Sequence, residues 1–311
     1  MAETCDEWAA AGRLNLWGEV PRIDELYLQK AATLSPERQA WERTLQENLG
    51  NAFYLPIHKR EFVKGASTAW DFVPDDPTLA RVLIIGDSIS RAYTLPVRRA
   101  LAGKANVHRA PENCGPTATG LKKLDVWIGS GKWDVIYFNF GIHDRATPVA
   151  DYEQRLNQII VRLRQTGASI IWASTTPIPS VPAKEQDPAA IVERNAIAAR
   201  LAQKHGLIVD DLFTFITPHL AATQLLNDVH FNARGYELLA TRVAASISAG
   251  LRPSPKRPRR SSSAGRSFRP RTSPAKRARI PPPVPLTLLV RWRFRPPPRL
   301  PSRILRPRTP C

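Results

Sequence analysis

Between residues 80 and 250, short and nearly continuous apolar runs alternate with longer stretches in which apolar residues recur every three or four positions. The apolar runs lie at 81–85, 134–140, 169–174 and 207–209, with a weaker one at 107–108. Such runs are typical of strands buried on both faces of a parallel sheet, and the longer stretches predict amphipathic helices. Because the two kinds alternate, the pattern predicts an α/β fold: a three-layer α/β/α domain with a parallel sheet of about five strands.

The helical periodicity extends over stretches that lie between and after the predicted strands. They are residues 92–102, 121–128, 149–165, 189–205 and 233–249. The preceding part of the chain lacks this alternation, and we expect residues 1–79 to form a helical or irregular N-terminal lead-in. Within it, Ser35 followed by Pro36 predicts the start of a helix that ends near Gly50. We expect the segment from Leu55 to Pro77 to be extended.

The composition of the chain changes abruptly after Gly250. Residues 252–311 contain 15 of the 29 prolines and 18 of the 45 Lys and Arg residues, but no Asp or Glu. The other 27 basic residues are balanced by 27 acidic ones, so the net charge of +18 belongs to this last segment. Such a segment cannot bury enough apolar surface to offset its ordering entropy, which predicts a disordered basic tail. The predicted domain at 80–251 is therefore followed by a tail that is either genuine or an appended reading frame.

The cysteines and the N-terminal residues indicate the cellular compartment in which we expect the protein. Cys5, Cys114 and Cys311 are too few and too far apart to form a disulfide framework. No run of about 18 apolar residues exists, so we expect no membrane span. Residues 1–17 contain acidic residues and no apolar core, unlike a secretory signal peptide. We therefore expect a cytoplasmic protein, or a secreted one if Met1 is not the true start; the oligomeric state stays open.

Polar clusters follow two of the predicted strands and precede the last predicted helix. They are Gly86-Asp87-Ser88, Gly141-Ile142-His143-Asp144 and Asn227-Asp228-Val229-His230. In an open parallel sheet these positions meet at the carboxyl edge, where ligands bind. A serine hydrolase needs a hydroxyl nucleophile, a base that takes its proton and a group that orients the base. Ser88, His230 and Asp228 are the candidates for these three roles.

Other well-known catalytic motifs are missing from the sequence. It has no G-x-S-x-G nucleophile elbow, no phosphate-binding G-x-x-x-x-G-K-[ST] and no dinucleotide-binding G-x-G-x-x-G. The remaining histidines do not have the spacing of metal ligands, so we expect neither a metal nor a cofactor. Cys114 lies beside the candidate site, and we expect it to be a small buried residue rather than a nucleophile.

Four blocks of the sequence together resemble the SGNH (GDSL-like) hydrolase family. They are Val82–Ser90, with its Gly-Asp-Ser, Asn113–Thr117, Gly141–Asp144 and Asp228–Asn232. The resemblance covers roughly residues 80–250 and holds in both order and spacing. It implies a flavodoxin-like fold and hydrolysis of acyl esters or thioesters by a serine nucleophile without a metal. It also implies that the amides of Ser88 and Gly115 stabilise the oxyanion.

Two positions depart from the usual pattern of that family. His143 stands where an asparagine normally completes the oxyanion hole, and an imidazole N–H can donate there, with a pH dependence of its own. The usual carboxylate position, three residues before the histidine, is Asn227, and the acid is Asp228. Either the loop is wound differently or another group orients His230. The chain is similar to a sub-branch with Gly-x-His-Asp in place of Gly-x-Asn-Asp.

The resemblance implies an esterase for small acyl groups, with acetyl esters of a carbohydrate as one such substrate. A second hypothesis is a non-catalytic module of the same fold that binds a carbohydrate or a protein partner. A third is a nucleic-acid-associated protein that acts through the basic tail, whose Arg-rich runs would neutralise phosphates.

Overall fold

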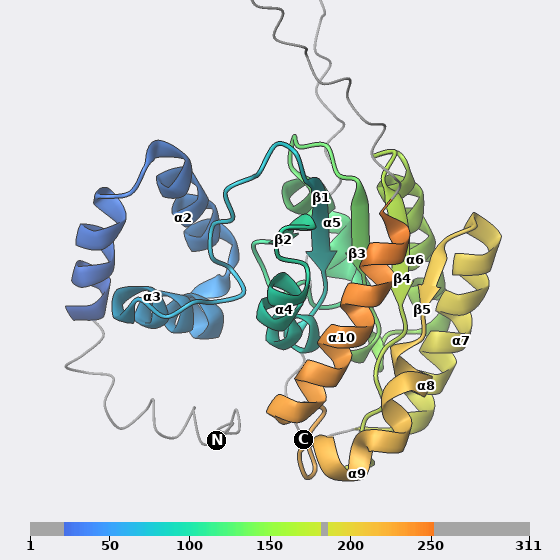
Figure 1. Cartoon of the computed structure of the whole chain (residues 1–311). Helices are drawn as coiled ribbons and strands as arrows, with labels where there is room; N and C mark the ends of the chain where they lie inside the picture. The colour runs from blue at the N-terminus through green and yellow to red at the C-terminus, as the bar shows by residue number, and fades with distance from the viewer. Residues whose placement is uncertain (1–21, 182–185, 252–311) are drawn as a thin grey trace, which may run out of the picture. The chain divides into compact units, whose positions relative to one another are not determined.

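The computed structural model describes residues 22–181 and 186–251 of the chain. Its centre is a five-stranded sheet of order β2-β1-β3-β4-β5, in which every neighbouring pair is parallel (Figure 1). The strands are β1 (Ala80–Ile85), β2 (Ala105–Arg109), β3 (Val135–Phe138), β4 (Ser169–Ala173) and β5 (Ile208–Asp210). The strand count and the parallel arrangement confirm the sequence prediction.

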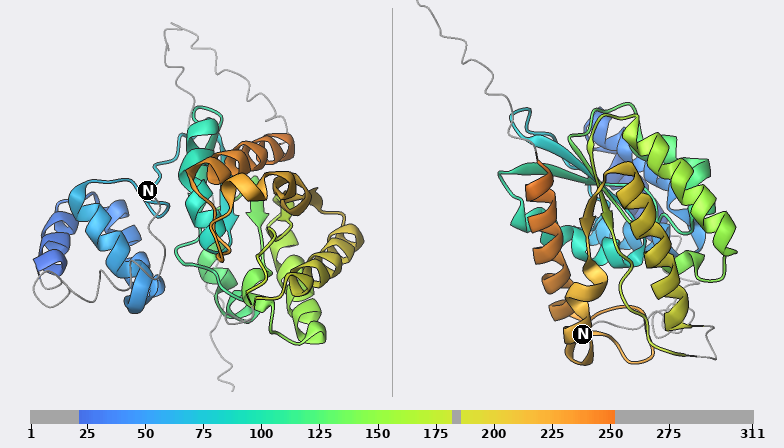
Figure 2. Two further views of the ribbon diagram at one scale, coloured as in Figure 1. Left: turned by 90° about the horizontal axis from the view of Figure 1, so that it is seen from below. Right: turned by 90° about the vertical axis from the view of Figure 1, so that its right-hand side faces the viewer.

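Helices cover both faces of this sheet. One face carries α4 (Ser88–Ala100) and α10 (Ala233–Gly250), and the other carries α5 (Thr117–Ile128), α6 (Val149–Arg164) and α7 (Pro188–His205). The right-hand view of Figure 2 shows α10 on one side of the strands and α6 and α7 on the other. Short helices complete the domain: η2 (Ile142–Asp144), α8 (Leu212–Ile216), η4 (Thr217–His219) and α9 (Leu220–Thr223). The fold is therefore the three-layer α/β/α fold that the sequence predicts.

The central strands β1 and β3 are apolar over most of their length because each face meets a layer of helices. In β1, Val82 and Ile84 pack with α4 and α10, whereas Leu83 and Ile85 pack with the α5–α7 layer. All four side chains are at most 1% exposed. Full burial of such a side chain contributes about 1.5–3 kcal/mol, so the sheet has little freedom to shift its register.

The N-terminal segment departs from the prediction in one place. The helix α2 (Pro36–Asn48) begins after the N-cap Ser35 as expected, and a π-helical turn, η1 (Gly50–Tyr54), follows it. The expectation of an extended chain from Leu55 is wrong, because residues 55–64 form the helix α3 (Leu55–Lys64). Pro56 lies in the first turn of α3, where its missing N–H costs no hydrogen bond. Beyond Gly65 the chain has no helix or strand until β1.

The structure does not test the predicted domain boundaries. The strand β1 begins at Ala80 and α10 ends at Gly250, but the division into 1–79, 80–251 and 252–311 stays a prediction. The basic tail and residues 1–21 lie outside the described residues. Within residues 22–181 and 186–251, no helix is both long enough and apolar enough to span a membrane.

The strand order also determines where a ligand site can form. β1 lies between β2 and β3, so the chain leaves β1 toward one edge of the sheet and later returns to its other side. In folds of this type the loops diverge at such a switch point and leave a crevice beyond the carboxyl ends of the strands. Ser88, the first residue after the loop that follows β1, lies at this point.

Candidate active site

Ser88 occupies a tight turn between β1 and α4. Asp87 caps the helix, because its Oδ1 accepts a hydrogen bond of 2.9 Å from the Ile89 amide. Gly86 has no room for a side chain, since a Cβ there would lie 2.8 Å from Ser90 Oγ. As the first residue of α4, Ser88 has an amide without an intrahelical acceptor, at the positive end of the helix dipole. The turn therefore places the Ser88 hydroxyl at the positive end of α4, beyond the carboxyl end of β1.

The three candidate residues for nucleophilic chemistry form one chain of hydrogen bonds. Ser88 Oγ lies 2.8 Å from His230 Nε2, and His230 Nδ1 lies 2.7 Å from Asp228 Oδ1. The His230 and Asp228 side chains are 21% and 18% exposed, so the pair is partly shielded from solvent. A carboxylate on Nδ1 fixes the tautomer that leaves Nε2 as the acceptor for the serine proton.

The loop before α10 explains how an acid two residues before the histidine reaches its ring. Asn227 has a left-handed backbone (φ 54°), and the Leu225 amide donates to the His230 carbonyl at 2.9 Å, which closes the loop. Asp228 Oδ1 accepts a second hydrogen bond, of 3.1 Å, from the His230 amide. The loop is therefore wound so that Asp228 contacts the imidazole.

The loop after β2 lies against the nucleophile turn. The Cys114 amide donates to the Gly86 carbonyl at 3.2 Å, which places the next residue, Gly115, near Ser88 along the sheet edge. Gly115 has a left-handed backbone (φ 62°) and leads through Pro116 into α5. This conformation favours glycine, and it lets the chain turn sharply without a side chain beside the crevice.

Cys114 is completely buried next to this loop. Burial raises the pKa of its thiol to about 12, against which the nearby Arg109 charge has only a partial effect. The side chain is therefore a neutral thiol near pH 7 and not an activated nucleophile, in agreement with the expectation from the sequence.

The loop after β3 carries His143 on the other side of Ser88. Gly141 packs so closely that a Cβ there would lie 2.0 Å from Thr175 Oγ1. The short helix η2 that follows presents His143 as an exposed residue, and no hydrogen bond of its ring occurs within the described residues. The structure thus brings Gly115 and His143 to loops on either side of the nucleophile turn, because β2 and β3 flank β1.

Two residues that the sequence reasoning gave no role connect these loops. Asp144 is fully buried, and its two oxygens accept hydrogen bonds from the Thr117 amide (2.8 Å) and the Thr117 hydroxyl (2.7 Å). It therefore fastens the loop of His143 to the start of α5, next to Gly115. Arg109, at the end of β2, is 2% exposed and donates to the backbone of the nucleophile turn. The position of Asp144 inside the Gly141–Asp144 block was a usable signal, whereas nothing in the local sequence distinguishes Arg109.

Comparison with known proteins assigns this fold and site to a family. Residues 84–238 match the GDSL-like lipase/acylhydrolase family, and the chain belongs to this family of SGNH hydrolases. The match spans the nucleophile turn, the Gly115 and His143 loops and the loop with Asp228 and His230. Among curated proteins, no significant match to the chain is found.

Solved structures of similar fold include other hydrolases. A lipase/acylhydrolase of Enterococcus faecalis is 24% identical, with a TM-score of 0.51 over 56% of this chain and 98% of that protein. An acetylxylan esterase of Geobacillus stearothermophilus is 16% identical, with a TM-score of 0.48 over 54% and 94% of the two chains. An α/β hydrolase from the metagenome of Lake Arreo in Spain is 17% identical, with a TM-score of 0.48 over 56% and 97%. At these identities the likeness concerns the fold.

We expect Asp144→Ala to destabilise the protein, because the buried Thr117 amide then loses its acceptor. An unmet buried donor costs about 1–3 kcal/mol of unfolding free energy, which urea denaturation measures. Asp151→Ala is the matched control: Asp151 is 47% exposed and pairs with Arg155 within α6, so its loss should matter little. Equal stabilities of the two variants would contradict the fastening role of Asp144.

Proposed function

We propose that this protein hydrolyses acyl esters through a covalent acyl-enzyme on Ser88. The observation that carries the proposal is the continuous hydrogen-bond chain from Ser88 Oγ through His230 to Asp228, with contacts of 2.8 and 2.7 Å. The arrangement supplies a nucleophile, a general base within reach of its proton, and a carboxylate that orients the base. Membership of the GDSL-like lipase/acylhydrolase family supports the same class of reaction.

In the first half of the proposed reaction, His230 Nε2 takes the Ser88 proton while Oγ attacks the ester carbonyl carbon. The tetrahedral intermediate collapses, the bond to the alcohol oxygen breaks, and His230 returns the proton to that oxygen. In the second half, His230 takes a proton from water, which attacks the acyl carbon. Collapse then breaks the bond to Ser88 Oγ, and His230 reprotonates the serine as the carboxylic acid leaves.

The proposed oxyanion donors come from three loops. The Ser88 amide belongs to the first turn of α4, the Gly115 amide follows the loop that hydrogen-bonds to Gly86, and His143 lies on η2. Donors aimed at the developing negative charge supply much of the rate enhancement in acyl transfer. The exposed ring of His143 is accessible to a substrate in the crevice, which supports its role as the side-chain donor.

For the substrate we propose small acyl esters, with acetyl groups on a carbohydrate as the first to test. This part of the proposal rests on the family resemblance. The other two hypotheses, a binding module and a protein that acts through its basic tail, find less support. A purely binding module has no need of the serine–histidine–carboxylate chain, and the tail lies outside the described residues.

We expect Ser88→Ala and His230→Ala each to lower the turnover of p-nitrophenyl acetate by about 10³-fold or more, because members of such a chain act as a unit. The double variant should be little worse than either single one. Ser130→Ala changes an exposed serine before β3 and should leave the rate unchanged. Wild-type turnover by Ser88→Ala would show that the nucleophile is another group.

The orienting role of Asp228 leads to a ranking of two neighbouring variants. Asp228→Asn should lower kcat strongly, because the amide cannot stabilise the imidazolium that forms in each step. Asn227→Gly should lower kcat much less, since glycine keeps the left-handed backbone and Asp228 makes the contact to the ring. Steady-state kinetics with thermal melting of both variants separates activity from folding. The reverse ranking would mean that Asn227 serves the base.

His143→Ala should lower kcat by about 10²-fold with little change in KM, because a donor to the oxyanion acts mainly in the transition state. His143→Asn restores the residue usual in the family and should recover part of the rate. Burst titration of active sites gives kcat per competent molecule. Full activity per site in His143→Ala would leave the Ser88 and Gly115 amides as the only proposed donors.

A further inference from the structure

The guanidinium of Arg109 holds the backbone on the N-terminal side of Ser88. Its Nη2 atom donates to the carbonyl oxygens of both Gly86 (2.8 Å) and Asp87 (2.9 Å). The other nitrogen, Nη1, donates to Ser90 Oγ at 2.6 Å, and Ser90 in turn donates to the Asp87 carbonyl at 2.7 Å. The residues on both sides of Ser88 are therefore bound to one rigid, planar group.

This cation is buried and has no salt bridge to an acidic side chain among the residues that the structure describes. Arg109 is 2% exposed. Burial lowers the pKa of Arg109, but a guanidinium keeps its charge where an amine would not. Its compensation comes from carbonyl dipoles, from the nearby charge of Asp87 and from Trp70, whose ring centre lies 5.9 Å from Arg109 Cζ. If water reached the guanidinium, water would compete with the Gly86 and Asp87 carbonyls for its N–H groups. The Trp70 ring, which shields the guanidinium, therefore helps to keep these hydrogen bonds.

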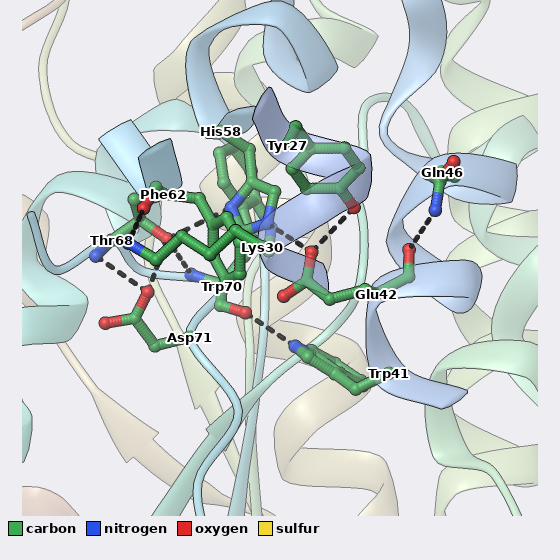
Figure 3. A network of polar contacts seen from close by, with 10 residues as sticks. All are labelled: Tyr27, Lys30, Trp41, Glu42, Gln46, His58, Phe62, Thr68, Trp70 and Asp71. Atoms are coloured by element: carbon green, nitrogen blue, oxygen red, sulfur yellow. Dashed lines mark hydrogen bonds and ion pairs between the residues drawn. The ribbon is translucent and has the colours of Figure 1, made fainter. Parts of the chain in front are cut away.

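Trp70 belongs to the N-terminal segment and not to the sheet domain around Ser88. Its side chain is 1% exposed and packs with Leu45, Leu49 and Leu55 of the α2–α3 region. Its carbonyl accepts a 2.6 Å hydrogen bond from Trp41 Nε1, as Figure 3 shows. The ring is therefore held in place by the helical lead-in.

A buried polar network fixes the loop that carries Trp70. Thr68 Oγ1 donates to Asp71 at 3.0 Å, accepts from the Trp70 amide at 3.1 Å and lies 3.4 Å from His58 Nδ1 (Figure 3). His58, in α3, contacts Glu42 of α2 at 2.8 Å. From the other side, Arg98 of α4 donates to the carbonyls of Thr68 and Ala69. The loop is thus joined both to the lead-in and to the helix that begins at Ser88.

We propose that Arg109 and Trp70 are positioning residues for Ser88: Arg109 sets the backbone of the nucleophile turn, and Trp70 keeps Arg109 dry. The inference rests on the proposed function, since it assigns a purpose to the turn that carries the nucleophile. The N-terminal segment is then a working part of the esterase rather than an appendage. A displacement of a reacting group by about 1 Å can cost about 10²-fold in rate. A small shift of the turn that carries Ser88 should therefore lower the rate strongly.

The test uses the full chain and two measurements, kcat and KM for p-nitrophenyl acetate and the second-order rate of Ser88 labelling by a fluorophosphonate. Both are normalised to folded protein by circular dichroism. Arg109→Met removes all donors while keeping a long apolar stem, and should lower both rates by about 10²-fold with KM within about threefold. Arg109→Lys should recover only part, because a single ammonium can donate to the two carbonyls but cannot also supply the second nitrogen that donates to Ser90 Oγ.

Trp70→Leu keeps an apolar cover but removes the ring, and should lower both rates by about tenfold in the wild-type background. In the Arg109→Met background it should lower them little further, because the two side chains act through one another.

Arg81 and Trp133 form the matched control pair. Arg81 Cζ lies 4.2 Å from the Trp133 ring, with no hydrogen bond to the nucleophile turn among the described residues. Arg81→Met and Trp133→Leu should leave both normalised rates unchanged, whatever their melting temperatures.

Normalised rates of Arg109→Met within twofold of wild type, or a decrease no larger than that of the control pair, would overturn the proposal. If Arg109→Met does not fold, Arg109→Lys and Trp70→Leu decide, and wild-type rates in both would overturn it as well. Ser88→Ala distinguishes failure of the positioning role from failure of the proposed function. An inactive Ser88→Ala beside a fully active Arg109→Met removes only the positioning role, whereas an active Ser88→Ala removes the proposed function itself.

Discussion

The position of β1 between β2 and β3 is the constraint on which the rest of the structure depends. Both faces of β1 are covered by helices, and the side chains of its residues 82–85 are buried, so the strand can pair in only one register. Parallel pairing brings the carboxyl ends of the three strands to the same edge. The turn with Ser88 therefore lies between the loops of Gly115 and His143, although the three lie far apart in the sequence.

Buried hydrogen bonds then convert this proximity into a defined geometry. The Gly86 carbonyl accepts from both the Cys114 amide and Arg109, and Asp144 accepts twice from Thr117. Each of these groups is shielded from water, where a polar contact is stronger and an unmet one is costly. The loops are thus locked to one another before any substrate binds, as preorganised electrostatic stabilisation requires.

The fold, and the proximity of Ser88 to His230, could be predicted because their signals are local. Continuous apolar runs mark the strands, Ser88 follows β1 after two loop residues, and His230 lies shortly before α10. The expectation of an extended chain over Leu55–Lys64 fails because proline fits the first turn of a helix, so Pro56 does not exclude one. Arg109 could not be found from its neighbours, since its contacts depend on β2 pairing beside β1. The winding of the loop that brings Asp228 to His230 depends on the left-handed Asn227, which the sequence left open.

In the proposed function, Ser88 is a nucleophile that His230 activates. Incubation with a fluorophosphonate, followed by mass spectrometry of the proteolytic peptides, is the sharpest test, because the reagent forms a stable bond only with an activated hydroxyl. We expect one phosphonyl group, on Ser88, in the wild-type protein and almost none in His230→Ala. An adduct on a residue other than Ser88 would contradict this role of Ser88. Loss of activity on treatment with the reagent while Ser88 stays unmodified would contradict it as well.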